Sequence, residues 1–142
     1  MRVMVIVKAT KESEAGALPD RESLTAMGKF NEELVKAGVM LDAAGVRASS
    51  NGKRVKFSGG KAALLTDGPF METKELIAGY WVWKVKSVDE AVEWLKRAPF
   101  RDEEVEIRPF FEPEDFGENL TLELHEQQER MREEMLRQSG RH

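Results

Sequence analysis

The sequence predicts an α+β fold, in which an antiparallel sheet carries two helices and a helical extension follows at the C-terminus. Apolar, β-favouring runs and two amphipathic stretches follow one another in the order β-α-β, hairpin, β-α-β. This order resembles the split βαβ arrangement of ferredoxin-like domains. A chain of 142 residues with 41% apolar residues is long enough for one domain with a sizeable core. From residue 113 onward the chain is acidic and poor in apolar residues. We therefore expect a domain over residues 1–112 and an acidic helical tail over residues 113–142.

The first predicted unit is β-α-β. Residues 3–7 are apolar at every position, which is typical of a strand buried on both faces. Residues 9–18 are polar or small and predict a loop. Asp20 is the expected N-cap of a helix over residues 21–37, because apolar residues then recur at helical spacing. Gly38 ends this helix.

A strand and a hairpin follow. Residues 39–47 predict a weak strand, and residues 49–52 (SSNG) predict a turn. Residues 54–58 alternate between apolar and basic side chains, and Gly59-Gly60 predicts a tight connection to a strand over residues 61–66.

The second β-α-β unit is predicted over residues 78–111. Its first strand, residues 78–85, is again apolar on both faces. Ser87 with Glu90 forms a capping-box pattern before a helix whose stripe ends at Leu95. Residues 105–111 predict the last strand.

A helix is predicted in the tail over residues 120–138, with Asn119 as its cap. Glu126 with Arg130 and Glu133 with Arg137 are favourable i,i+4 pairs, each contributing about 0.2–0.5 kcal/mol.

The predicted sheet has one apolar face too many for a monomer. Two helices cover only one face of a four-stranded sheet, yet residues 3–7 and 80–83 are apolar on both faces. Monomers rarely expose a large apolar patch, and a two-fold interface uses the same patch on both chains. We therefore expect a homodimer that packs through its sheet faces.

Composition excludes several functions. The chain has no cysteine, which excludes disulfides, thiol catalysis and thiolate metal sites. A net charge of −4 gives no pull toward nucleic acid or an anionic membrane. The apolar run at residues 3–7 is too short for a signal peptide or a membrane span. Phosphate-binding loops, nucleophile elbows and zinc spacings are absent. We expect a cytoplasmic protein without a nucleic-acid or membrane partner, a metal or a cofactor.

The loop at residues 67–75 (DGPFMETKE) is the candidate site, because loops often carry function. Asp67 suits a turn, and Pro69 restricts the Gly68 before it. Phe70 is expected to fill an apolar gap. A ligand-binding pocket wall is predicted from the loop, the next strand and the last strand. The candidate ligand-binding residues are Asp67, Phe70, Glu72, Thr73, Lys74, Glu75, Tyr80 and Arg108.

Other chemistry is open for the same residues. Asp67, Glu72 and Glu75 would suit acid–base catalysis if one of them is buried, and Lys74 would bind an anionic or carbonyl group. The alternative is that they form a turn and local ion pairs. Three carboxylates would also suit a hard cation, but their spacing matches no metal-binding loop.

The aromatic residues and the last strand leave further alternatives. Trp81 and Trp83, with Tyr80 and Phe57, either line a small pocket between sheet and helices or belong to the core or dimer interface. Arg108 is a candidate buried partner for a loop carboxylate.

A family resemblance rests on this loop. The sequence DGPFMETKE, followed by Gly79-Tyr80, resembles the signature of the YCII-related family and specifically its DGPF branch. The surrounding strands and helices fit, so the resemblance covers residues 1–112. Met71 stands where the family often has alanine.

The resemblance implies a ferredoxin-like protomer that forms a dimeric α/β barrel. It implies no general reaction, because none is established for the branch. Some relatives are proposed to be enzymes with a His-Asp pair, but here His125 and His142 both lie in the tail, so that pair is not carried over. Genes of the branch often neighbour those of extracytoplasmic-function sigma factors. We therefore expect a binding or regulatory protein for an unknown small molecule, with a small isomerase or lyase and a sigma-factor-associated interaction protein as alternatives.

Overall fold

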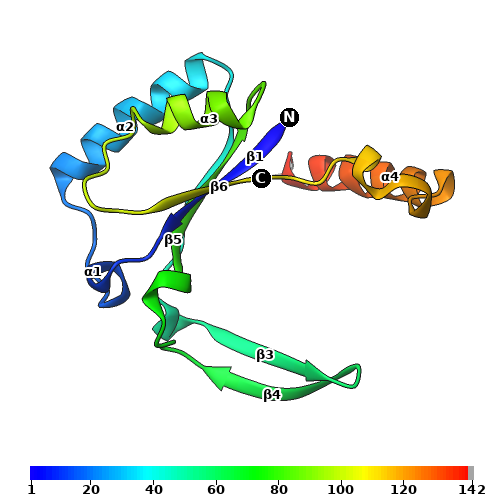
Figure 1. The fold of residues 1–142 in the computed structure, drawn as a ribbon, viewed down its shortest axis with the longest axis horizontal. Coiled ribbons are helices and arrows are strands. Elements are labelled where there is room, and N and C mark those ends of the chain that lie inside the picture. The colour runs from blue at the N-terminus through cyan, green and yellow to red at the C-terminus, as the bar shows by residue number, and fades with distance from the viewer. Residues whose placement is uncertain (141–142) are drawn as a thin grey trace. The chain divides into compact units, whose positions relative to one another are not determined.

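The computed structural model describes residues 1–140 (Figure 1). The strands are β1 (Arg2–Lys8), β2 (Met40–Gly45), β3 (Lys53–Ser58), β4 (Lys61–Asp67), β5 (Ile77–Lys84) and β6 (Val105–Pro109). The α-helices are α1 (Lys11–Glu14), α2 (Arg21–Lys36), α3 (Val88–Leu95) and α4 (Leu122–Ser139), and the 3₁₀ helices are η1 (Ser49–Asn51), η2 (Thr73–Glu75) and η3 (Pro113–Asn119). The chain divides into two compact units, Met1–Phe110 and Phe111–His142.

An antiparallel sheet with the order β2-β5-β1-β6 organises the first unit. In the central strand β1, Val5 lies opposite Trp81 of β5 on one side and Ile107 of β6 on the other. Because β1 and β2 are separated by β5, each β-α-β unit is split by a strand of the other. The predicted α+β, ferredoxin-like fold class is therefore confirmed.

Helices α2 and α3 cover one face of this sheet (Figure 1). The core is made by alternate residues of the strands together with one stripe of each helix. Edge-on contacts join the ring of Phe30 to those of Trp81 and Trp83, at centroid distances of 6.0 and 6.4 Å. Burying one large apolar side chain stabilises the fold by about 1.5–3 kcal/mol, so this cluster dominates stability. The buried members are Val3, Val5, Phe30, Leu34, Val39, Trp81, Trp83, Val85 and Ala91.

The opposite face of the sheet has a different character. Met4, Ile6, Tyr80 and Val82 alternate with the core residues of β1 and β5, and each is only half-buried. The expectation that β1 is buried on both faces is thus met on one face within a single chain. Whether a second chain covers the other face stays a prediction.

The helix starts follow the expected chemistry with one difference. Asp20 accepts a hydrogen bond from the Ser23 N–H at 2.8 Å, which confirms it as the N-cap of α2. Ser87 caps α3 by accepting from the Glu90 N–H at 3.1 Å. The Glu90 carboxylate, however, accepts from the Lys86 N–H at 2.7 Å instead of from Ser87. The reciprocal half of the predicted capping box is therefore wrong.

The loop predicted at residues 9–18 contains the short helix α1. Thr10 accepts from the Ser13 N–H at 3.1 Å, and the Ser13 hydroxyl accepts from the Thr10 N–H at 2.9 Å. This reciprocal pair satisfies two backbone donors and starts a helix within a stretch without apolar periodicity.

Strands β3 and β4 form a separate two-stranded sheet. Gly59 and Gly60 both have positive φ, at 59° and 80°, which confirms the predicted tight turn. Phe57 is 67% exposed. The alternative in which Phe57 lines a pocket between the main sheet and its helices is wrong, because the hairpin extends away from that sheet (Figure 1).

The second unit consists of η3 and α4. The N-cap of α4 is Thr121, which accepts from the Leu124 N–H at 3.2 Å, and not Asn119, because Asn119 is the last residue of η3. Arg137 pairs with Glu134 at 2.6 Å, one residue nearer than the predicted partner Glu133. Over residues 1–140, no helix has the length and apolar character needed to cross a membrane.

Candidate functional site

The loop at residues 67–70 packs its backbone directly onto η1. The Gly68 N–H donates to the Gly52 carbonyl at 3.0 Å. A Cβ on Gly68 would lie 1.8 Å from the Ser49 carbonyl oxygen, so no side chain fits at this position. Glycine is therefore required here by a close approach of two backbone segments.

Phe70 is held at both its backbone and its ring. Its N–H donates to the Ser49 hydroxyl at 3.0 Å. Its half-buried ring lies under the Arg54 guanidinium, 3.8 Å from the ring centroid. Phe70 thus joins β3 to η1 through a cation–π contact and a hydrogen bond, where an apolar gap was expected.

Asp67 lies at the end of β4 and pairs with Lys53 across the hairpin at 2.9 Å. Both side chains are well exposed. A pair of this kind contributes at most about 1 kcal/mol and leaves Asp67 without a burial that would favour catalysis.

The remaining loop residues lie at or before η2. A hydrogen bond between the Glu72 and Glu75 side chains, together with repulsion between them, raises the pKa of Glu72 above its ordinary value. Both carboxyls and Lys74 are exposed, and Thr73 is half-buried. This cluster faces solvent.

Tyr80 and Arg108 lie on the sheet face opposite α2 and α3. Arg108 is exposed and donates to Glu106 at 3.1 Å. The prediction that Arg108 is a buried partner of a loop carboxylate is wrong, because strand β6 places its own carboxylate, Glu106, beside it. The described contacts therefore pair Arg108 with its own strand and not with the loop.

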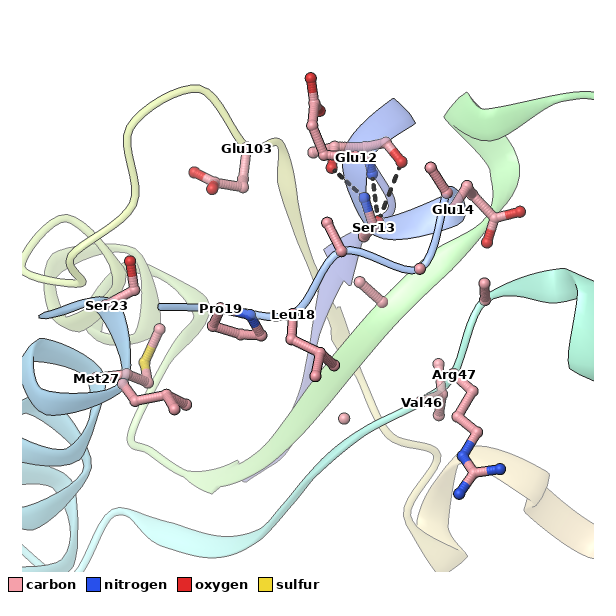
Figure 2. A pocket seen from close by; sticks show the side chains of 18 of the residues that line it. Glu12, Ser13, Glu14, Leu18, Pro19, Ser23, Met27, Val46, Arg47 and Glu103 are labelled. Carbon is pink, nitrogen blue, oxygen red and sulfur yellow. Dashed lines mark hydrogen bonds between the residues drawn. The ribbon is translucent and has the colours of Figure 1, made fainter. Parts of the chain in front are cut away.

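A large cavity lies elsewhere in the first unit, next to η1. Its volume is about 840 Å³. It is open to solvent on one side and is bordered by α1 and the following loop, the first turns of α2, the end of β2, and the segment after α3 (Figure 2). The lining residues are 10, 12–19, 23, 24, 27, 45–48, 50, 51, 78, 99, 100 and 103.

The cavity combines an apolar lining with a few polar groups. Leu24 and Met27 of α2 lie on one side and Val46 on another, with Phe100 completing the apolar surface. Figure 2 shows Glu103 and Arg47 on opposite sides of this view. A pocket of this size and composition is typical of small-molecule sites.

The cavity carboxylates differ from those of the loop. Burial of the Glu103 carboxyl opposes its ionisation, but bonds from the backbone N–H groups of Arg101 and Asp102, at 2.8 and 3.1 Å, hold its pKa below the ordinary value. Glu103 is thus a fixed anion at neutral pH. Glu12 is an exposed carboxylate on the wall of the same cavity.

None of the eight residues predicted from the sequence lines this cavity. Their role in ligand binding stays a prediction. The lining residues were missed because they come from four separate segments that meet only in the fold. Thr10 with Ser13 gives one usable signal, since this pair caps a helix in the middle of the expected loop.

Metal ligation has no visible basis in the described part of the chain. Residues 1–140 contain no group of three or more His, Asp or Glu side chains placed to hold an ion. His125 belongs to α4, and His142 lies outside the described residues.

The comparison with family models agrees with the resemblance found in the sequence. The model of the YCII-related domain family matches residues 1–112. No curated protein matches the chain. Among solved structures, the chain is similar to 5-chloro-2-hydroxyhydroquinone dehydrochlorinase from Burkholderia phenoliruptrix AC1100, in complex with 2,5-dihydroxybenzoquinone. The identity is 15%, the match covers 80% of this chain and 98% of that chain, and the TM-score is 0.39.

Proposed function

This chain belongs to the YCII-related domain family, and on that premise we propose that it is a small-molecule-binding or regulatory homodimer whose ligand occupies the cavity beside η1. We place it in the DGPF branch because of the sequence at residues 67–75. The cavity is the observation that carries the proposal. Its volume of about 840 Å³ lies in the range of about 300–1,000 Å³ typical of ligand pockets.

The lining favours a largely apolar small molecule. Leu24, Met27 and Phe100 supply apolar contact, and burial of apolar ligand surface would supply most of the affinity. Ser50 and Asn51 supply hydroxyl and amide groups that would orient the molecule. Arg47 would select an acidic group on it.

The homodimer is proposed from the sheet face that carries Met4, Ile6, Tyr80 and Val82. This face is continuous across β1 and β5, and within the first unit no helix lies on it. Packing two copies face to face would remove its apolar surface from water and would use the same residues on both chains.

The enzyme alternative has one specific observation in its favour. The pKa of Glu72 is raised above its ordinary value, so this carboxyl keeps its proton to a higher pH than an ordinary glutamate, as suits an acid catalyst. Glu72 does not line the cavity, so an isomerase or lyase would use the open surface of the loop. Loss of turnover in Glu72→Gln with ligand binding retained would favour this alternative.

Native mass spectrometry of the protein purified from cells tests the proposal, since it reports stoichiometry and retained ligand together. Leu24 is exposed and lines the cavity, so Leu24→Trp fills the site at little cost to the core. Val35→Trp is the matched control, because Val35 is equally exposed on the same helix and lies outside the cavity.

We expect a dimer with a reproducible extra mass that Leu24→Trp removes and Val35→Trp keeps. Loss of the mass in Lys74→Ala, with Leu24→Trp unaffected, would instead place the ligand at the 67–75 loop. A monomer would contradict the homodimer.

A further inference from the structure

The segment η1 belongs to both the cavity and the 67–70 loop. Ala48, Ser50 and Asn51 line the cavity, whereas Ser49 does not. Ser49 is half-buried behind the wall, where its hydroxyl meets Glu14 and the Phe70 backbone. Any shift of Ser49 therefore moves the cavity-lining residues on either side of it.

Three hydrogen bonds fix Ser49 in place. Its N–H donates to Glu14 Oε2 at 2.8 Å, and its hydroxyl donates to Glu14 Oε1. The same hydroxyl accepts from the Phe70 N–H at 3.0 Å. A serine hydroxyl has one proton to donate, so the bond to Glu14 directs its lone pairs toward Phe70. Both bonds to Glu14 are charge-assisted and therefore stronger than neutral ones.

The chain is arranged to bring these groups together. Gly68 allows the loop backbone to lie against the Ser49 carbonyl, where a Cβ would be 1.8 Å away. Glu14 is placed by α1, which the Thr10–Ser13 pair caps. Glu14 itself lines the cavity, so the three bonds connect two parts of the cavity wall to the loop.

We propose that the 67–70 loop positions the cavity wall through a relay from the Phe70 N–H to Ser49 and from Ser49 to Glu14. Ser49 and Glu14 are positioning residues, and the loop determines ligand affinity without touching the ligand. The role in affinity rests on the proposed ligand site, whereas the relay itself does not. The relay would allow the 67–70 loop to influence ligand binding without lining the cavity.

Amide hydrogen exchange of the full chain tests the relay without any ligand. In Glu14→Ala the Ser49 hydroxyl loses its acceptor, and we expect exchange of the Phe70 amide to rise by about tenfold. Glu12→Ala is the matched control, because Glu12 is a carboxylate of the same short helix that also lines the cavity. It should leave the Phe70 amide unchanged. Ser49→Ala should reproduce the increase, and Ser49→Thr, which keeps the hydroxyl, should restore protection.

Three outcomes would overturn the relay. One is an unchanged Phe70 amide in Glu14→Ala, and another is an equal change in Glu12→Ala. The third is an equal loss of protection in the amides of β1, which would assign the effect to global unfolding.

Binding of the fluorescent dye 1-anilinonaphthalene-8-sulfonate separates the relay from the proposed function. We expect Leu24→Trp to abolish dye binding in the cavity, and Glu14→Ala and Ser49→Ala to weaken it about tenfold. If Leu24→Trp blocks dye binding but Glu14→Ala leaves exchange of the Phe70 amide unchanged, the relay is overturned and the cavity remains the proposed site. If Glu14→Ala raises exchange of the Phe70 amide but Leu24→Trp leaves dye binding unchanged, the relay is supported and the cavity is contradicted as the site.

Discussion

The 67–75 loop and the cavity wall at residues 10–19 differ in how distinctive their sequences are and in whether they line the cavity. The loop has a distinctive sequence, but its role in the fold is backbone contact: Gly68 lies against Ser49, and the Phe70 N–H binds the Ser49 hydroxyl. The wall is built largely from small and common residues, yet it lines one side of an open cavity of about 840 Å³. A demanding backbone geometry restricts residue types more than an apolar ligand surface does. A distinctive motif therefore marks where the chain is tightly constrained, and the binding surface can lie next to it.

The largest expected effect comes from the loop side of this comparison. Gly68→Ala places a Cβ against a backbone carbonyl that cannot move cheaply, so we expect it to destabilise the protein by about 1–3 kcal/mol or more. Gly28→Ala is the control, because Gly28 lies within α2 with open space around its Cβ position. It should stabilise the protein by about 0.5–1 kcal/mol. Urea unfolding measures both, and similar values for the two variants would contradict the backbone role of Gly68.

The wall side depends on the capping of α1. Thr10→Ala removes one acceptor from a reciprocal pair, and we expect a local cost of about 1 kcal/mol. Because α1 has no buried residue, exchange at residues 11–15 should rise while the global melting temperature barely changes. Thr25→Ala, within α2, should leave those amides unchanged. A global loss of stability in Thr10→Ala would show that α1 belongs to the core and not to a separate wall.

The cation–π contact between Arg54 and Phe70 gives a third, smaller test on the loop side. Arg54→Ala removes the cation above the ring, with an expected loss of about 0.5–1 kcal/mol. Lys56→Ala on the same face of β3 is the control and should change stability by less. Thermal unfolding of both variants, together with the Phe70 amide exchange, measures the difference. Equal effects would mean that the ring does not depend on Arg54.

The smallest effect is a difference in pH dependence between the two regions. The folded-state pKa of Glu72 is raised, so its contribution to stability is present below the ordinary value of 4.5 and is lost as pH rises through the folded pKa. The pKa of Glu103 is lowered, so its contribution is present above 4.5 and is lost as pH falls through the folded pKa. Glu72→Gln and Glu103→Gln should therefore change the slope of stability against pH in opposite directions. Slopes that change in the same direction would contradict these assignments.

The sequence predicts the fold well but gives no indication of the cavity, for physical reasons. The periodicity of α2 and the apolar strands encode burial directly, and Asp20 and Gly38 set the ends of the helix. The helix α1 has no apolar stripe, so its side-chain cap is the signal in the sequence that predicts it. The partner of Arg108 is Glu106, which lies two residues earlier on the same strand and therefore on the same face of the sheet.

The cavity is the hardest feature to predict, since its lining comes from segments far apart in the sequence. Leu24 and Val46 meet across it only after α2 has packed on the sheet. Neither residue stands out locally. Leu24 is the first apolar residue of the α2 stripe, and it lies at the cavity and not in the core because the stripe is buried only from Phe30 onward.

The most direct test of the central claim is methyl chemical-shift mapping during titration with 1-anilinonaphthalene-8-sulfonate. We expect the methyl groups of Leu24, Met27 and Val46 to shift first and to saturate together, because they line the cavity. The methyl groups of Met71 and of Thr73 in the 67–75 loop should change little. Early shifts at Met71 and Thr73, with Leu24 and Met27 unaffected, would contradict the claim and return the ligand site to the loop itself.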